Sequence, residues 1–208
     1  MKTNNFPEEN YAKEEITLNI GLVYVFGTFV LVAAILLFGI PFYFIWPEKI
    51  QEVVNTVKNN YTMGLQERMI MGIKNLGIVL AIVLPLIVIH ELIHGLFYSI
   101  FSKNGFKSIK FGIVPKKFIL YCDCTEVLRK NHFIIGTIMP FILMGIIPAV
   151  ISIFIGNVIL LYWAILFIGA GCVDLAGTLK LLKEKNDSWI IFECTEMAGT
   201  IYRPKNNK

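Results

Sequence analysis

Residues 76–101 read LGIVLAIVLPLIVIHELIHGLFYSIF, a largely apolar stretch that carries His90, Glu91 and His94 toward its carboxyl end. A helix of about 20 apolar residues is long enough to cross the hydrocarbon core of a bilayer. The stretch therefore predicts a membrane-spanning helix. Ionisable side chains inside such a helix are costly to place in lipid, and where they occur they usually mark a functional site.

Three more apolar blocks indicate that the whole chain is organised around helices of this kind. They are residues 22–46, 133–155 and 158–182. The composition agrees, because 56% of the residues are hydrophobic, 16% are charged and the mean hydropathy is +0.66, far from the usage of soluble domains. We expect one domain over residues 1–208, an all-α integral membrane protein built as a four-helix transmembrane bundle. Only Gly156 and Asn157 separate the last two blocks, so these should form an antiparallel hairpin.

The distribution of positive charge predicts how the chain lies in the cell membrane. Of the 19 Lys and Arg residues, 15 lie before the first block, in the loop 102–132 or from residue 180 onward, and the other four lie in the loop 47–75. Loops rich in Lys and Arg tend to stay in the cytoplasm. We therefore expect a multi-pass protein with cytoplasmic N- and C-termini. The acidic segment 1–19 lacks the cleavage site of a signal peptide, so the first apolar block should be retained.

Two loop segments have patterns of their own. From Ile50 to Val57, apolar residues follow the i, i+3, i+4, i+7 spacing of one helix face, which predicts an amphipathic helix on the membrane surface. Segments 106–114 and 117–124 are rich in aromatic and β-branched residues, which predicts a short cytoplasmic β-hairpin. The hairpin edge can receive an extended substrate strand, or its basic residues can contact anionic lipid headgroups. The sequence leaves both open.

The pattern His90-Glu91-Leu92-Ile93-His94 fits H-E-x-x-H, in which two histidines one helical turn apart point the same way and can share a metal ion. Zinc is the natural ion, because imidazoles, a carboxylate and a water at an open fourth position form the usual catalytic zinc site. Glu91 is the candidate general base that takes a proton from this water. The alternative is a polar contact between helices that holds no metal.

Asp174 is the candidate third ligand, because it is the only acidic residue inside any block apart from Glu91. It lies eight residues before the end of its block, and the two histidines lie eleven and seven residues before the end of theirs. At about 1.5 Å per residue the three fall at similar depth. Zn²⁺, two neutral histidines and two ionised carboxylates sum to zero charge, which lowers the cost of burial. The alternative is a protonated or Asn-paired Asp174 with a structural role.

Helix-shaping residues surround these candidates. Pro85, one turn before His90, should kink the second helix. Gly169, Gly171 and Gly177 flank Asp174 and can let the fourth helix come close to the second, or they only pack helices.

Other polar residues are weaker candidates. His132 can be an oxyanion donor or a fourth ligand, but a lone histidine directly before an apolar block is more often a boundary residue. Asp123 and Glu126 can bind a surface metal with neighbouring cysteines, against the simpler interpretation of a solvated loop. The cysteines are spaced too irregularly for a disulfide scaffold and should be reduced thiols. They are Cys122, Cys124, Cys172 and Cys194.

Two resemblances follow from these motifs. An H-E-x-x-H followed by Gly95 in a membrane helix, with an aspartate in a later helix, resembles the intramembrane zinc metalloproteases of the site-2 protease type. The chain after about Lys74 is also similar to a family of small four-span bacterial membrane proteins catalogued as "putative zincin peptidases", which share His90-Glu91-x-x-His94-Gly95 and Gly169-Ala-Gly-Cys-Val-Asp174. The resemblance implies His90, His94 and Asp174 as zinc ligands and Glu91 as catalytic base. Site-2 proteases usually show Asn-Pro-Asp-Gly around the aspartate, whereas this chain has Cys172-Val-Asp-Leu.

The predicted function is zinc-dependent hydrolysis of a peptide or membrane-protein substrate, within the membrane or at its edge, with lipid around the helices. Two alternatives stay open: a zinc transporter, and a non-catalytic protein that binds a membrane partner and uses the metal to hold its helices. A transporter needs a continuous polar path, and the sequence offers one histidine motif. A purely structural metal site has no need of Glu91. Lys and Arg lie beside apolar blocks without aromatic interleaving, which argues against nucleic acid as a partner.

Overall fold

The structure is a computed structural model that describes residues 6–114, 119–193 and 198–205. Most of these residues are helical. The helices are α1 (Ile20–Ala34), α2 (Ile40–Ile45), α3 (Pro47–Thr62), α4 (Leu65–Phe101), α5 (Lys130–Pro140), α6 (Ile147–Ile155), α7 (Val158–Ala170) and α8 (Cys172–Leu182). Two π-helical segments, η2 (Ile35–Gly39) and η4 (Phe141–Ile146), continue α1 into α2 and α5 into α6, and η1 (Glu8–Asn10) and η3 (Gly105–Ser108) are short 3-10 turns. The strands are β1 (Tyr11–Thr17), β2 (Ile109–Val114), β3 (Ile119–Cys124), β4 (Leu128–Arg129), β5 (Trp189–Glu193) and β6 (Ala198–Pro204).

The helices correspond to the predicted apolar blocks, with one block broken in two. In the part of the chain that the structure describes, three helices are long and apolar enough to cross a membrane: Gly21–Ile45, Leu65–Phe101 and Lys130–Ile155. The predicted block 158–182 is instead the pair α7 and α8, bent by 50°, which gives a fourth span if the pair counts as one. The bend occurs because the backbone leaves the helical range at Gly171, where ψ is 14°.

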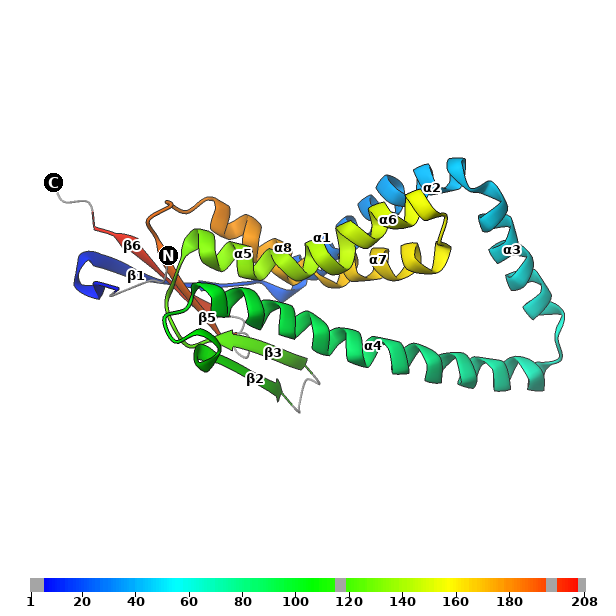
Figure 1. The fold of residues 1–208 in the computed structure, drawn as a ribbon, viewed down its shortest axis with the longest axis horizontal. Coiled ribbons are helices and arrows are strands. Elements are labelled where there is room, and N and C mark those ends of the chain that lie inside the picture. Colours follow the sequence, from blue (N-terminus) through cyan, green and yellow to red (C-terminus); the bar gives the residue numbers. More distant parts are fainter. Residues whose placement is uncertain (1–5, 115–118, 194–197, 206–208) are drawn as a thin grey trace.

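α4 begins earlier than the sequence predicts, at Leu65. The added residues, LQERMIMGIKN, are mostly good helix formers, and Glu67 lies in the first turn, where a negative charge is favourable. α4 continues as one helix through Pro85, and the kink expected there stays a prediction (Figure 1). A proline removes only one backbone hydrogen bond. The hydrogen bonds of the long helical segments on both sides of Pro85 keep the helix continuous.

α1, α2 and α5 to α8 pack together, α3 extends away from them to the start of α4, and α4 lies along their side (Figure 1). α1, α2, α6 and α7 share a core that includes Phe42, Ala149, Ala164 and Ile168. α4 packs on α5 with its carboxyl half, whereas its residues 65–84 are almost all exposed. The arrangement differs from a regular four-helix bundle in this respect. Exposed apolar side chains of this kind are compatible with contact to lipid.

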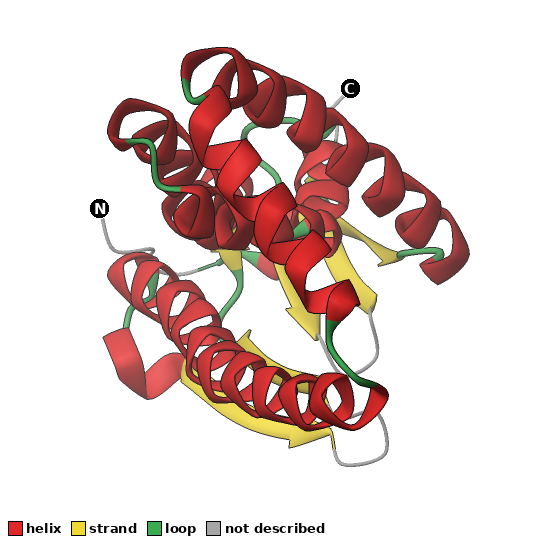
Figure 2. Cartoon of the chain, turned by 90° about the vertical axis from the view of Figure 1, so that its right-hand side faces the viewer, coloured by secondary structure: helices red, strands yellow, loops and turns green. Residues whose placement is uncertain are grey.

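A four-stranded antiparallel sheet, with the order β1-β6-β5-β4, corrects the all-α prediction. β1 and β6 pair along their whole length, although they come from opposite ends of the chain. Such a pairing leaves no local signal in the sequence, and the exposed Glu14 and Glu15 in β1 hide the alternating pattern of a strand. The sheet lies at the end of the molecule that holds both termini, which is behind the helices in Figure 2.

Charged side chains fasten this sheet to the helices. Arg203 in β6 pairs with Glu14 in β1, and its Nε lies 2.7 Å from the Oε2 atom of Glu184 just after α8. The hydrogen bonds from Arg203 hold the pKa of Glu184 below its ordinary value. Lys180 Nζ donates to the carbonyl oxygen of Thr17 at 2.8 Å. β1 is therefore held against the end of α8.

Both loop predictions correspond to observed elements. α3 is the helix expected in the loop 47–75, and none of its residues is buried; its place on the membrane surface stays a prediction. β2 and β3 form the expected hairpin, paired from Ile109↔Cys124 to Val114↔Ile119, and the connection 115–118 lies outside the described residues. The hairpin lies on the carboxyl half of α4 (Figure 1).

Candidate metal centre

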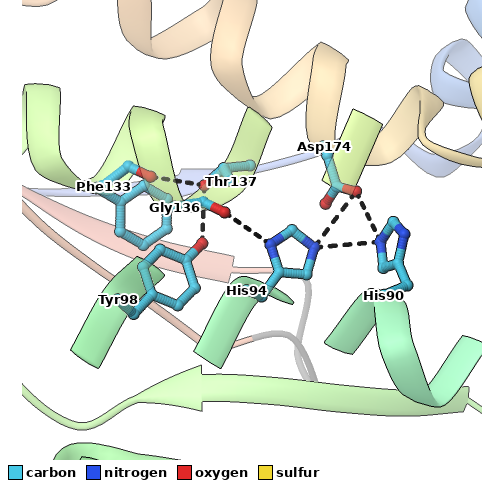
Figure 3. A network of polar contacts seen from close by, with 7 residues as sticks. All are labelled: His90, His94, Tyr98, Phe133, Gly136, Thr137 and Asp174. Atoms are coloured by element: carbon cyan, nitrogen blue, oxygen red, sulfur yellow. Dashed lines mark hydrogen bonds and ion pairs between the residues drawn. The ribbon is translucent and has the colours of Figure 1, made fainter. Parts of the chain in front are cut away.

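Two histidines on α4 and an aspartate on α8 converge on one point (Figure 3). His90 and His94 are one helical turn apart, and Asp174 lies in the first turn of its helix. The Oδ2 atom of Asp174 is 3.2 Å from His90 Nε2 and 3.5 Å from His94 Nε2, and the two Nε2 atoms are 3.2 Å apart. The structure thus brings together the three side chains that the sequence predicts as a group.

The donor atoms and their spacing fit a zinc ion. Two imidazole nitrogens with one carboxylate oxygen are a common set of protein ligands in catalytic zinc sites. Ligand atoms about 2.0 to 2.2 Å from a tetrahedral zinc lie roughly 3.3 to 3.6 Å from one another. The observed separations of 3.2, 3.2 and 3.5 Å are close to this range. These three residues would hold a zinc ion and would leave room for a water or substrate as a further ligand.

A hydrogen bond between His94 and α5 determines which ring nitrogen of His94 carries the proton. The Nδ1 atom of His94 lies 2.9 Å from the carbonyl oxygen of Gly136 on α5. A carbonyl only accepts, so Nδ1 is the donor, and in a neutral imidazole the lone pair of Nε2 is then free. His94 is buried, with a relative exposure of 6%. Its free nitrogen therefore faces His90 and Asp174, as metal binding requires.

The converging side chains lie in the wall of a cavity of about 360 Å³. Glu91 and Lys180 line the same cavity, together with apolar and weakly polar residues of β3, α5, α8 and the terminal sheet. A few polar groups in a mostly apolar pocket are typical of a ligand-binding site. The position of Glu91 puts a carboxylate beside the His90, His94 and Asp174 group without making it a member of that group.

Comparison with known proteins bears on this site. A family model described as "Putative zincin peptidase" matches residues 83–189, just over half of the 208 residues. The chain belongs to this family. The matched range contains all three converging side chains as well as Glu91. Membership of the zincin family implies a zinc peptidase. Searches of curated proteins and of solved structures find no significant match.

In this zincin-family chain His132 lies apart from the converging group, and none of the described cysteines is a member of it. The His132 ring stacks on Phe101, with centroids 4.3 Å apart, and does not line the cavity. Cys122, Cys124 and Cys172 are buried thiols. Burial, and then the nearby Glu91 carboxylate, raise the pKa of the Cys122 thiol far above its ordinary value. The Cys122 thiol is therefore protonated at neutral pH. Cys194 lies outside the described residues.

Asp123 and Glu126 do not form the surface metal site considered from the sequence. Among the residues that the structure describes, neither belongs to a group with metal-ligand spacing. The Glu126 carboxylate accepts hydrogen bonds from the backbone N–H groups of Lys103 at 2.7 Å and Asn104 at 3.1 Å. It also accepts one from the hydroxyl of Ser108. Glu126 thus joins the loop after β3 to the end of α4.

Three residues around His94 were not predicted from the sequence. They are Tyr98, Gly136 and Thr137, which connect α4 to α5 (Figure 3). Tyr98 lies one turn after His94, and this spacing is the only signal that the sequence carries for it. Gly136 contributes a backbone carbonyl, which no residue type reveals.

Proposed function

We propose that this chain is a zinc peptidase that acts within the membrane or at its edge. The observation that carries the proposal is the convergence of His90, His94 and Asp174, at distances suited to zinc, in a cavity that Glu91 also lines. Membership of the zincin peptidase family supports it. His90, His94 and Asp174 are the proposed zinc ligands, and Glu91 is the proposed general base.

Glu91 supplies the proton transfers that peptide hydrolysis needs. A zinc ion, when bound, supplies a Lewis acid for the substrate carbonyl and for water. The Glu91 carboxylate takes one proton from the attacking water, whose oxygen forms a bond to the carbonyl carbon of the peptide. Glu91 then gives this proton to the amide nitrogen as the C–N bond breaks. The products are a carboxylic acid and an amine.

The proposed location is several residues below the cytoplasmic surface of the membrane. His90 and His94 lie eleven and seven residues before Phe101, the last residue of α4. At about 1.5 Å per residue this corresponds to roughly 10 to 17 Å along the helix. We keep the orientation that the charges predict, with both termini in the cytoplasm. The pairing of β1 with β6 agrees with termini on the same side, because the two terminal strands share one sheet, and the choice of the cytoplasmic side rests on the charges.

The proposed substrate is a peptide segment that binds in extended form beside β3. In the described part of the chain β3 pairs with β2 in a two-stranded sheet, and its residues Leu120, Tyr121, Cys122 and Cys124 line the cavity. The edge of a sheet can pair with an extended chain. A substrate bound in this way would pass beside Glu91. A zinc transporter is less favoured, because a single group of metal-ligand spacing occurs in the described ranges.

Metal content is the first test. Zinc in detergent-purified protein would be measured by elemental mass spectrometry for wild type, Glu91→Gln, His94→Ala and Asp174→Ala. We expect about one zinc per chain in wild type and in Glu91→Gln, and a large loss in the other two, because only these remove a ligand. Wild-type protein that lacks zinc when prepared without chelators would contradict the proposed site.

Hydrolysis separates a peptidase from a protein that only binds zinc. A library of quenched fluorescent membrane peptides would be incubated with zinc-loaded wild type and Glu91→Gln in detergent. We expect cleavage by wild type and a loss of about 100-fold or more in Glu91→Gln, since general base catalysis contributes about that much. Equal, zinc-independent cleavage by both proteins would contradict the role of Glu91.

A further inference from the structure

The hydrogen bond from His94 to Gly136 depends on how α5 lies along α4, and a second contact one turn away fixes this register. Tyr98 follows His94 by four residues on α4, and Thr137 follows Gly136 on α5. The hydroxyl oxygens of Tyr98 and Thr137 are 2.8 Å apart, and both residues are buried, at 5% and 7% exposure. Figure 3 shows the two interhelical hydrogen bonds next to each other.

The direction of the hydroxyl contact follows from a third partner. Thr137 Oγ1 donates to the carbonyl oxygen of Phe133, one turn earlier on α5, at 2.9 Å. A hydroxyl has a single proton, so Thr137 accepts from Tyr98. The Tyr98 hydroxyl thus points at a lone pair of Thr137 Oγ1. This hydrogen bond restricts the position of the Tyr98 side chain relative to α5 more than apolar packing would.

The Tyr98 ring fills the space between His94 and α5. It is nearly parallel to the His94 ring, at 11° with centroids 6.0 Å apart, and it stacks on Phe133 at 5.3 Å. A Cβ atom at Gly136 would lie 2.2 Å from two carbons of the Tyr98 ring. The close approach of the two helices therefore needs glycine at 136. It is this approach that brings the Gly136 carbonyl within reach of His94.

We propose that Tyr98 and Thr137 are positioning residues of the metal centre. Their hydrogen bond holds the Gly136 carbonyl against His94 Nδ1, so that His94 Nε2 faces His90 and Asp174. This inference rests on the proposed function, since it concerns the same site. The two hydroxyls bond to each other, and Gly136, the residue before Thr137, bonds to His94, so both residues act through His94. Changes to such supporting partners typically weaken metal binding by about 10- to 100-fold.

Zinc affinity tests the proposal with conservative variants. Tyr98→Phe and Thr137→Val each remove a hydroxyl with little change of shape, and we expect each to weaken zinc binding by about 10- to 100-fold in competition with a fluorescent chelator. The double variant should bind no more weakly than either single variant, because the two side chains share one hydrogen bond. Thr137→Ser keeps the hydroxyl and should bind as wild type does.

Thr178→Val is the matched control. Thr178 is a buried threonine on α8, and its hydroxyl has no hydrogen-bond partner in the described part of the chain. The same substitution there should leave zinc affinity unchanged. Melting temperatures of all variants would show how much each hydroxyl contributes to the fold alone.

The protonation pattern of His94 gives a readout that does not need zinc. Nitrogen-15 NMR of metal-free protein at alkaline pH, where the imidazole ring is neutral, should show the Nδ1–H form in wild type, and a mixture of the two neutral forms in Tyr98→Phe and Thr137→Val. Variants that melt earlier but keep wild-type zinc affinity and the Nδ1–H form would overturn the positioning role. The two proposals can fail separately. If wild type binds no zinc, the zinc peptidase proposal is refuted. If the protonation of His94 nevertheless changes in both variants, the positioning role is supported.

Discussion

Asp174 is suited to carry a negative charge because of where α8 begins. The helical run of α7 ends before Gly171, and α8 starts at Cys172, which makes Asp174 the third residue of a new helix. The first N–H groups of a helix have no partner within it and create a positive potential. A straight span, as the sequence predicts, would place Asp174 in mid-helix without this potential. The bend therefore favours the ionised form that a zinc ligand needs.

Glu126 makes an acid-sensitive connection between the hairpin and α4. Burial raises the pKa of its carboxyl, but the hydrogen bonds from Ser108, Lys103 and Asn104 outweigh this and hold the pKa below its ordinary value. The unfolded value is about 4.3. Because the folded pKa is the lower one, the stabilisation is complete above the unfolded value and is lost as the pH falls through the folded value. We expect Glu126→Gln to lower the free energy of unfolding by about 1 to 2 kcal/mol at neutral pH.

The measurement for Glu126 is a series of melting curves in detergent from about pH 7 down to about pH 3, a window that brackets the ordinary carboxyl pKa. The difference between wild type and Glu126→Gln should be constant at the upper end and shrink toward the lower end. Glu15→Gln, at an exposed position of β1, should match wild type throughout. A difference for Glu126→Gln that does not change with pH would show that side-chain shape, and not the charge, stabilises the connection.

At the scale of elements, the helices could be predicted because each apolar block carries its own signal. The histidine pair is equally local, since five consecutive residues of one helix, His90 to His94, contain the pattern. Asp174 could be placed beside the pair only by comparing depths along two spans, and the structure puts it 3.2 Å from His90. Both the histidine pair and the depth of Asp174 were predicted from distances along a helix, which has a fixed rise per residue.

The elements that could not be predicted depend on contacts between distant segments. β1 becomes a strand because β6 lies beside it, and neither segment alternates strongly enough to show this alone. The bend at Gly171 is set by a single backbone angle. Tyr98 and Thr137 look like ordinary residues of apolar helices until α4 and α5 are placed side by side. Tertiary context therefore decides the surroundings of the site, although its charged residues are visible in the sequence.

Gly95 allows the hairpin to lie against α4, next to His94. A Cβ atom at this position would be 2.5 Å from the Cζ atom of Phe111 and 3.1 Å from Cγ2 of Ile109. Gly95→Val should therefore push β2 away and open the cavity wall that β3 forms, because an overpacked contact is relieved by backbone shifts. Cys122, which is buried at 3% exposure, reports the change. We expect N-ethylmaleimide to modify it at least about tenfold faster, which corresponds to roughly 1.4 kcal/mol of easier opening, as measured by peptide mass spectrometry.

A second substitution separates this steric effect from general damage. Phe111→Ala removes the ring that the new side chain would meet, so Gly95→Val combined with Phe111→Ala should return the labelling of Cys122 toward the wild-type rate. Phe111→Ala alone serves as the reference for the loss of the ring. If the combined variant is labelled as fast as Gly95→Val, the contact between Gly95 and Phe111 does not control the position of the hairpin.

At the scale of the whole molecule, the terminal sheet and the metal centre lie toward one end and α3 lies at the other (Figure 1). The two ends also differ in charge, since 15 of the 19 Lys and Arg residues belong to the end with the termini or to the loop 102–132. The distribution of charge and the shape of the molecule therefore indicate, independently, the same long axis from the terminal sheet to α3. The shape does not show which end of the molecule faces the cytoplasm. That assignment rests on the charges alone.

Cysteine labelling in intact cells tests this direction. In a background with the four native cysteines replaced by alanine, Lys58→Cys on α3 and Lys205→Cys after β6 introduce exposed probes at opposite ends. We expect a membrane-impermeant maleimide to label Lys58→Cys at once and Lys205→Cys only after the membrane is permeabilised, because positively charged segments stay in the cytoplasm. The reverse pattern would place the metal centre near the outer surface and direct the search for substrates to exported proteins. Labelling of both probes from outside would contradict a membrane between the two ends, and with it the span that α4 is proposed to form.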